Sequence, residues 1–289
     1  MHKCPYCKKV DSVKSGLRKN KSGFVQRYSC NNCKRQYVDR KGFENMRTNP
    51  EIVVTALDLR AQGLSYGKIC KHIKQKYGKT ITRSTVLLWQ NKFGEMISNF
   101  TKSFQLSHSF DAHADEVFFR EKGQRDRNFI YYWDCIDYKT KFLMGDHMSY
   151  ERDEFEARKF MEKVKTSVKE LPKRIHTDNS FDYPPSIRKT FGRGKVKHIH
   201  FPAWKMKFKN NPIERYHNTI KENYKVMRRF FSLETAYKFL KFFRNYYNFI
   251  RVHKSLNWKT PAQAAGFGKW NWYSLIRAFQ QSISMSFCL

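Results

Sequence analysis

Two pairs of closely spaced cysteines give the start of this chain a recognisable metal-binding chemistry. Cys4 and Cys7 form one Cys-x-x-Cys pair, Cys30 and Cys33 form a second, and 22 residues separate the two pairs. Four thiolates at this spacing can enclose one Zn²⁺ ion and so fold a segment that has too little hydrophobic core of its own. The sequence therefore predicts a zinc ribbon over residues 1–47 in a reducing compartment. The three other cysteines have no such neighbours and are interpreted as packing residues: Cys70, Cys135 and Cys288.

Three carboxylates in the second half of the chain are candidate ligands for a divalent metal. Asp115 lies inside an apolar strand pattern, where an ionised carboxylate costs several kcal/mol unless it is paired or binds a cation. Asp178 ends a short strand-like run, at the position where open α/β sheets place their ligands. Glu214 stands at the head of a predicted helix that Pro212 opens. Taken alone, Asp115 or Asp178 is more simply interpreted as an ordinary aspartate at the end of a strand.

The predicted helix at Glu214 carries two rows of side chains at helical spacing. Asn210 or Asn211 can cap its first turn. The apolar row predicts the buried side and comprises Ile213, Tyr216, Ile220, Tyr224 and Met227. The neighbouring row starts with the acid and continues as Glu214, His217, Lys221, Lys225 and Arg228. An acidic head followed by basic residues suits a metal ligand with DNA running along the helix. A solvated charged face would explain the basic residues but not the glutamate at their head.

The elements around these carboxylates predict an α/β sheet domain. Strand-like runs cover residues 109–119, 128–137 and 141–148, and polar turns separate them. A helix with an apolar side from Ala157 to Leu171 follows, ends before Pro172, and leads to a strand over 174–178. Three antiparallel strands, a crossover helix and a further strand are the opening of an RNase H-like sheet.

Two smaller modules are predicted before the sheet domain. Between the cysteine pairs, Gly16 and Gly23 mark turns of a hairpin, with a strand over 24–28. Residues 50–94 show three helical periods, with Ser65 as an N-cap, Gly78 as a stop, and Thr82 or Ser84 opening the third helix.

This arrangement resembles a helix-turn-helix, whose last helix enters the major groove of DNA. On that interpretation Arg83 and Gln90 are candidates for facing DNA. A plain helical linker bundle is the alternative interpretation.

The charge distribution points to a polyanionic partner. The 289 residues include 57 Lys and Arg against 25 Asp and Glu, a formal net charge of +32. Residues 1–47 hold 13 basic and 3 acidic residues, residues 98–182 hold 15 and 16, and residues 203–261 hold 14 and 3. A neutral centre between basic flanks is typical of an acidic metal site surrounded by phosphate-binding surfaces. No apolar run approaches the length of a membrane span, and the first residues do not form a signal peptide, so we expect no membrane partner.

The spacing of the carboxylates resembles a known family. Asp115 and Asp178 are 63 positions apart, and 35 residues lie between Asp178 and Glu214. This spacing, with Pro-Ile-Glu-Arg-Tyr-His around Glu214, is similar to the DDE transposases of prokaryotic insertion sequences and, more distantly, to retroviral integrases. The run 245–253, followed by Thr-Pro-Ala-Gln-Ala at 260–264, looks like the closing signature of that family. One departure is Val252, where the family usually has proline, and it concerns the local turn rather than the carboxylates.

The resemblance implies a two-metal phosphoryl transfer. Asp115, Asp178 and Glu214 would hold two Mg²⁺ or Mn²⁺ ions that assist strand cleavage and then attack of the new 3′-OH on target DNA. Lys221 matches the basic residue of the family that contacts DNA beside the active site, and Lys225 and Arg228 continue the same row.

The resemblance also implies a fold and an assembly. We expect an α/β core with a mixed five-stranded sheet and flanking helices, preceded by the zinc ribbon and an all-α helix-turn-helix domain. The expected limits are 1–47 for the ribbon, 48–100 for the helix-turn-helix, 101–267 for the catalytic domain and 268–289 for a tail without an assigned role. The expected partners are transposon ends and target DNA, bound by a homodimer or larger assembly at the prokaryotic nucleoid in the cytoplasm.

Two other functions share some of these features. A domesticated or inactive transposase would act only as a sequence-specific DNA-binding protein, and three isolated carboxylates in a basic chain argue against it. An RNase H-like nuclease that only hydrolyses would use the same metals but join no strands. The terminal repeat sequence, the transposition pathway and the activity of this copy do not follow from the sequence.

Overall fold

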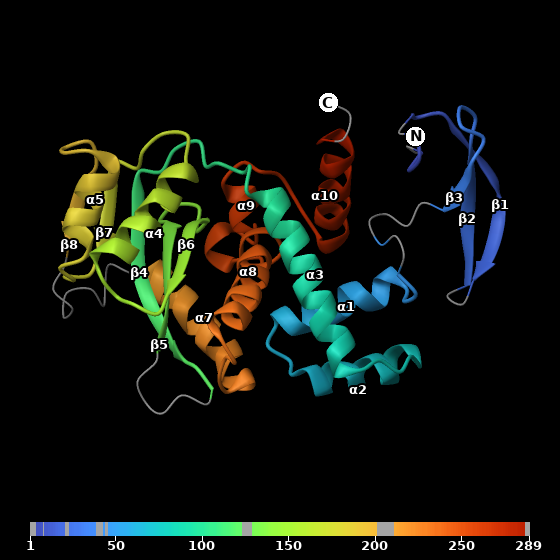
Figure 1. Ribbon diagram of the computed structural model, residues 1–289, viewed down its shortest axis with the longest axis horizontal. Coiled ribbons are helices and arrows are strands. Elements are labelled where there is room, and N and C mark those ends of the chain that lie inside the picture. The colour runs from blue at the N-terminus through green and yellow to red at the C-terminus, as the bar shows by residue number, and fades with distance from the viewer. Residues whose placement is uncertain are drawn as a thin grey trace.

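The computed structural model places a small sheet, a group of helices and a larger sheet along the long axis of the molecule (Figure 1). The described parts of the chain are residues 4–7, 9–20, 23–38, 43, 46–122, 129–200 and 211–286. Among them, no helix is long and apolar enough to cross a membrane.

The small sheet is antiparallel and has the strand order β1-β2-β3. Its strands are β1 (Ser12–Asn20), β2 (Gly23–Cys30) and β3 (Gln36–Val38). Gly16 does not form the expected turn: with a φ of 76° it lies inside β1, where the pairing register shifts between Lys14 and Leu17. A bulge needs such a conformation, which glycine adopts at little cost. The turn that joins β1 to β2 lies outside the described residues.

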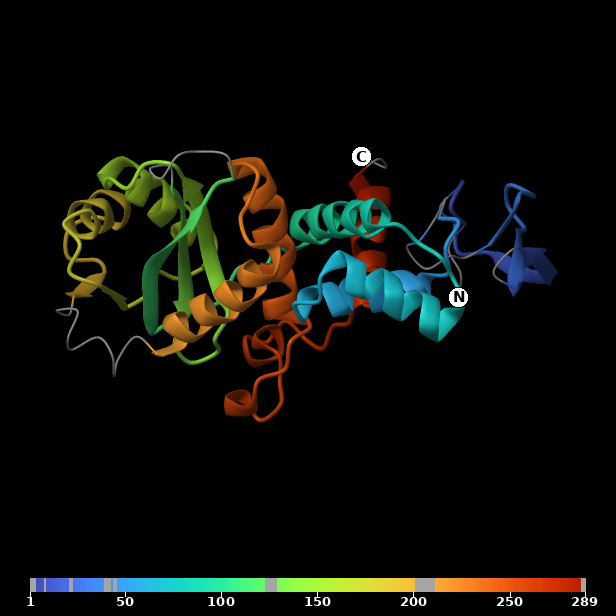
Figure 2. The same ribbon diagram turned by 90° about the horizontal axis from the view of Figure 1, so that it is seen from below.

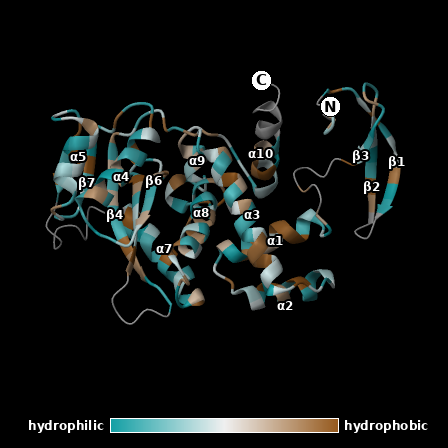
Figure 3. Cartoon of the chain, viewed as in Figure 1, coloured by the Kyte–Doolittle hydropathy of each residue, from teal (hydrophilic) through white to brown (hydrophobic). Residues whose placement is uncertain are grey.

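The helical module contains α1 (Pro50–Ala61), α2 (Tyr66–Tyr77) and α3 (Arg83–Thr101). The predicted caps are confirmed, since Ser65 and Thr82 accept backbone N–H groups and Gly78 ends α2 with a φ of 64°. In Figure 3, α1 is largely hydrophobic, as expected for the helix that packs against both others.

The third helix is longer than its sequence pattern indicates, because it continues into the core. A Cβ atom at Gly94 would lie 3.0 Å from the Cβ atom of Phe242, so glycine allows α3 to cross α8 (Leu233–Phe249) closely. The amide of Asn245 donates to the Gly94 carbonyl at 3.0 Å. One hydrophobic cluster therefore runs across the expected boundary at residue 100.

The large sheet confirms the predicted fold class. Its strand order is β6-β5-β4-β7-β8, with β4, β5 and β6 antiparallel and β7 and β8 parallel to β4. The strands are β4 (Asp111–Arg120), β5 (Phe129–Asp137), β6 (Leu143–Ser149), β7 (Arg174–Thr177) and β8 (Lys197–His200).

Helices cover both faces of the large sheet. One face is packed by α4 (Glu154–Thr166) and α5 (Tyr183–Phe191), and the other by α7 (Asn211–Met227) and α8, as Figures 1 and 2 show. The helix predicted to reach Leu171 ends at Thr166 instead. Val168 pairs with Leu106 in a short parallel bridge, so its side chain is buried without a helical backbone.

The C-terminal segment returns to the helical module. It contains η1 (Lys254–Leu256), α9 (Pro261–Ala264) and α10 (Trp272–Ser286). The Trp272 ring stacks on Phe242 with centroids 5.5 Å apart, and its indole N–H donates to Asp58 at 3.3 Å. The segment expected as a tail thus includes a helix that packs against α3.

Candidate active site and metal sites

Three aspartates stand side by side across the centre of the large sheet. Asp115 on β4 is opposite Asp134 on β5, and Asp134 is opposite Asp146 on β6. Residues directly opposite each other point to the same face, with Cβ atoms about 5 Å apart, and like charges there destabilise the sheet. We call Asp115, Asp134 and Asp146 the aspartate row. The row requires compensating charge from the helices that cover it.

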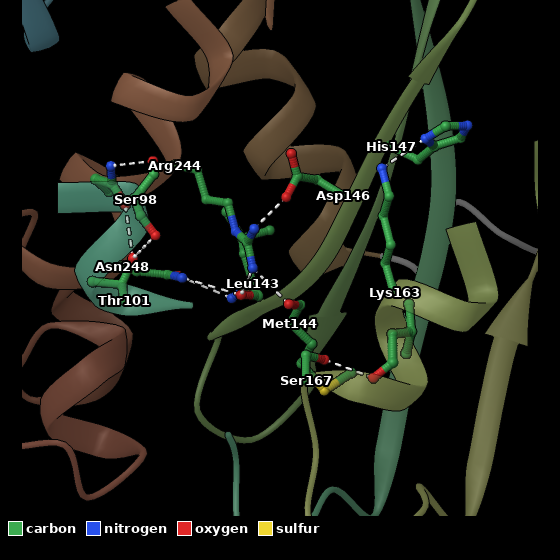
Figure 4. A network of polar contacts seen from close by, with 12 residues as sticks. Ser98, Thr101, Leu143, Met144, Asp146, His147, Lys163, Ser167, Arg244 and Asn248 are labelled. Atoms are coloured by element: carbon green, nitrogen blue, oxygen red, sulfur yellow. Dashed lines mark hydrogen bonds and ion pairs between the residues drawn. The ribbon is translucent and has the colours of Figure 1, made fainter. Parts of the chain in front are cut away.

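Two cations on α7 and α8 compensate part of this charge. The imidazole of His217 on α7 donates from Nε2 to Oδ2 of Asp134 at 2.8 Å, and its Nδ1 lies 3.7 Å from Oδ2 of Asp115. Burial opposes the charged imidazole, but the carboxylates of Asp134 and Asp115 outweigh it and raise the pKa of His217. Arg244 on α8 pairs with Asp146, as Figure 4 shows.

Helix α8 also anchors the edge strand β6 at this point. Arg244 donates to the carbonyl of Leu143, and Asn248 both accepts from the N–H of Leu143 at 2.9 Å and donates to its carbonyl at 3.1 Å (Figure 4). These side chains satisfy backbone groups of β6 where its register against β5 shifts. The far end of the aspartate row is therefore held rigidly.

Asp115 is the member of the row with the weakest compensation. About a fifth of its side chain, 20%, still reaches solvent, whereas that of Asp134 is fully buried. Burial nevertheless raises the pKa of Asp115 to about 7, with Glu116, Asp134 and Asp178 acting in the same direction and His217 against it. A carboxyl group in this situation is stabilised as an anion by a bound cation. Its chemistry fits a divalent metal.

Asp178 is brought close to Asp115 by the parallel pairing of β4 and β7. The parallel pairing ends with His113 opposite His176, and Asp115 and Asp178 each lie two residues further along their segments. Asp178 follows directly after β7, accepts the backbone N–H of Ser180 at 3.0 Å, and lies 3.8 Å from the guanidinium of Arg152.

Glu214 is carried to the same region by α7. It lies in the first turn of that helix, one turn before His217, whose ring touches Asp115. Residues three apart share a helix face. The three predicted carboxylates are therefore carried to one region. The ligand atoms of these three carboxylates do not all lie within 4.8 Å of one another. Among the described residues, only the four cysteines form a group that close.

The four predicted zinc ligands are brought together. The Sγ atoms of Cys4 and Cys33 are 3.6 Å apart, those of Cys7 and Cys30 are 3.5 Å apart, and all four lie within 4.8 Å of one another. Tetrahedral Zn–S bonds of about 2.3 Å place sulfurs roughly 3.8 Å apart. The backbone N–H of Lys9 lowers the pKa of Cys7 to about 6, whereas the backbone N–H of Arg35 is outweighed by burial and the neighbouring thiols, which raise the pKa of Cys33 to about 11. The set fits one Zn²⁺ ion.

The structure separates the residues predicted to face DNA. Arg83, Lys221 and Lys225 are exposed. Gln90 is not: only 2% of it is exposed, and its side-chain oxygen accepts from Arg60 at 3.1 Å and from Tyr66 at 2.9 Å. The prediction that Gln90 faces DNA is therefore wrong for this structure.

One member of the predicted charged row on α7 differs from expectation. Arg228 lies one residue beyond α7, with a φ of 70°, so it does not continue the helical row. His217, in the same row, is buried and pairs with Asp134 of the aspartate row. Of the two proposed caps, Asn210 lies outside the described residues.

Asp134 and Glu116 are two further acids of this region that the predicted metal ligands do not include. Alternation along β5 places Asp134 on the same face as Tyr132 and Ile136, and this period could have revealed it. Glu116 accepts from Arg152 and, at 2.6 Å, from the hydroxyl of Tyr183. It therefore helps to position the arginine beside Asp178.

Removing His217 tests the charge balance of the row. We expect His217→Ala to destabilise the fold by about 3–5 kcal/mol, because it leaves the fully buried Asp134 without its cation. The double variant Asp134→Asn with His217→Gln replaces the ion pair by an amide pair and should recover much of this loss. Denaturant unfolding of the three proteins measures both effects. A single variant that loses less than about 1 kcal/mol would contradict the charge balance.

Comparisons with known proteins agree with this architecture. A family model described as a DDE domain, that of IS240-type transposases, matches residues 109–253, which is half of the chain. The uncharacterized protein MJ0017 of Methanocaldococcus jannaschii is 24% identical over 223 residues, covering 75% of this chain and 95% of its own.

Solved structures of viral integrases also match part of the chain. The HTLV-2 integrase catalytic core domain in complex with magnesium is 14% identical, with 56% of this chain and 98% of that chain covered and a TM-score of 0.40. The simian T-cell lymphotropic virus intasome is 11% identical, with 73% of this chain and 74% of that chain covered and a TM-score of 0.43. The catalytic core domain of BIV integrase is 10% identical, with 61% of this chain and 97% of that chain covered and a TM-score of 0.36.

Proposed function

The chain belongs to the DDE-domain family of transposases, and on that premise we propose that it cuts the ends of an insertion sequence and joins their 3′-OH groups to target DNA. Membership of this family means that the chain carries a transposition-related nuclease domain. Recognition of the DNA ends and strand joining are what we propose in addition.

The weakly compensated carboxyl group of Asp115 is the observation that carries this proposal. A sheet that holds three neighbouring aspartates gains nothing in stability from the third, since like charges repel. His217 pairs with Asp134 and Arg244 pairs with Asp146, whereas Asp115 has His217 only at 3.7 Å and its pKa is raised to about 7 by burial. A largely buried carboxyl group with a raised pKa, at the partly exposed end of the row, is typical of a functional residue.

We propose that Asp115, Asp178 and Glu214 bind two divalent metal ions, either Mg²⁺ or Mn²⁺. Hard cations prefer such carboxylate oxygens. When bound, the metal supplies stabilisation of the negative charge that develops during phosphoryl transfer. The chain itself orients the ligands: His217 contacts Asp115, and Arg152 contacts both Asp178 and Glu116.

The basic surfaces are proposed to bind the DNA backbone. Lys221 and Lys225 are exposed one and two turns beyond His217 on α7, so phosphates along that helix would lead to the carboxylates. Arg83 is exposed at the start of α3, which suits a recognition helix entering a groove. We propose a homodimer or larger assembly, because the two DNA ends must be brought together before they are joined to the target DNA.

A strand-transfer assay tests the function. The substrate is a plasmid that carries the gene with its natural flanking DNA, incubated with the purified chain and Mg²⁺ or with Mg²⁺ omitted. We expect nicked ends with free 3′-OH groups and joined products only with the metal. Cleavage without joining would indicate a hydrolytic nuclease. Binding of the flanks without either product would favour the domesticated DNA-binding protein.

A further inference from the structure

A cavity of about 380 Å³ lies where the helical module meets the ends of α7 and α8. This volume falls in the range of roughly 300–1,000 Å³ that is typical of small-molecule sites. Its apolar walls are formed mainly by Leu87, Val226, Met227, Phe230, Phe231 and Phe239. The cavity lies between the helical module, which is expected to bind DNA, and α7, the helix that carries Glu214. None of the residues of the two proposed metal sites lines it.

A buried arginine with unused donors lines this cavity. Only 1% of Arg60 is exposed, and its guanidinium lies 4.9 Å from the ring centroid of Tyr66 and 4.8 Å from that of Phe239. Its Nε–H donates to Gln90, but neither terminal nitrogen has a hydrogen-bond partner among the described residues. Buried donors that are left without an acceptor cost about 1–3 kcal/mol each. An acceptor supplied from outside the chain would remove this cost.

The shape and charge of the cavity identify the class of ligand. We propose that it receives one unstacked nucleotide of the DNA substrate, with the edge of the base facing Arg60; this rests on the proposed function. The planar fork of an arginine matches the two acceptors O6 and N7 of guanine. Aromatic and aliphatic walls suit the faces of a base that has left the helical stack.

The rim of the cavity suits the rest of the nucleotide. Arg229 and Lys238 both line it, so a phosphate could be neutralised there while the base enters. A free phosphate alone would leave the apolar walls of Leu87, Met227 and Phe231 without a partner. The combination of a cationic floor, apolar walls and a basic rim therefore favours a whole nucleotide over an anion.

A duplex with a single bulged guanosine is the probe. Since the bulge is already unstacked, binding it avoids most of the cost of extruding a base. We expect the full zinc-loaded chain to bind this duplex about tenfold more tightly than the fully paired duplex of the same sequence, without added Mg²⁺. Fluorescence anisotropy of labelled duplexes measures the ratio. Equal affinity for the two duplexes would overturn the proposal.

Two neighbouring leucines provide a matched pair of variants. Leu87 lines the cavity and is 40% exposed, whereas Leu88 is 67% exposed and lies outside the lining. Leu87→Trp should fill part of the cavity and remove the preference for the bulge, and Leu88→Trp should retain it. Loss of the preference in both variants, or in neither, would contradict a site in this cavity.

Arg60→Met removes the donors but keeps most of the side-chain volume. We expect it to abolish the preference for the bulge without lowering Tm, because it also removes a buried charge. In competition, dGMP should displace the bulged duplex at least about tenfold better than dCMP or inorganic phosphate. Phosphate competing as well as dGMP would reveal an anion site and overturn the proposal. These binding assays do not depend on cleavage, so their failure is separate from failure of the strand-transfer assay.

Discussion

Asp178→Asn is expected to lower Mg²⁺-dependent cleavage and joining by on the order of a thousandfold while leaving DNA affinity unchanged. The amide is isosteric with the carboxylate but carries no charge, so it is a poor ligand for a divalent metal. It can still accept the backbone N–H of Ser180, which keeps the local turn intact. Single-turnover cleavage with saturating protein measures the effect, and anisotropy of the labelled DNA end measures binding.

Asp182→Asn is the control for this variant. Asp182 lies four residues further on, where its side chain accepts from the hydroxyl of Ser180 at 2.9 Å. The same chemical change there should leave cleavage within about threefold of the unmodified chain, since we assign it no metal. Retained activity of Asp178→Asn, or equal loss in both variants, would show that Asp178 is not a metal ligand.

Cys30→Ala is expected to unfold the small sheet and to release its zinc. Among the described residues, the buried hydrophobic cluster of this sheet consists of Cys4, Tyr28, Cys30 and Tyr37, so the sheet has little other than metal binding to stabilise it. Structural zinc sites contribute on the order of 10 kcal/mol to folding. We expect β1–β3 to lose protection from hydrogen exchange, and the large sheet to keep it.

The control is Cys70→Ala, since Cys70 is partly buried on α2 and far from the other thiols in sequence. It should keep one zinc ion per chain, measured by atomic emission. Protected β1–β3 amides in a zinc-free Cys30→Ala protein would show that the sheet folds without the metal.

Local physics explains which features the sequence predicted. The Cys-x-x-Cys pairs place two sulfurs within reach of one ion because the spacing itself sets their separation. Ser65 and Gly78 bound α2 because caps depend on the side chain and backbone of single residues. The strand-like runs of β4 and β5 predicted two strands because strand preference also depends on neighbouring residues in the chain.

Contacts between distant segments decided the rest. His217 meets Asp134 across 83 positions of sequence, and no local pattern on α7 distinguishes it from the exposed Lys221. Gln90 has the spacing of a groove-facing residue, yet packing of α3 against Arg60 buries it.

By itself, the sequence determined the four-cysteine cluster, the class of fold and the choice of candidate carboxylates, because each depends on spacing or on a repeating period along the chain. The tertiary structure alone decided how the charges are balanced and where Arg60 faces a cavity. Both depend on strand register and helix crossing, which bring together side chains that no spacing along the chain relates.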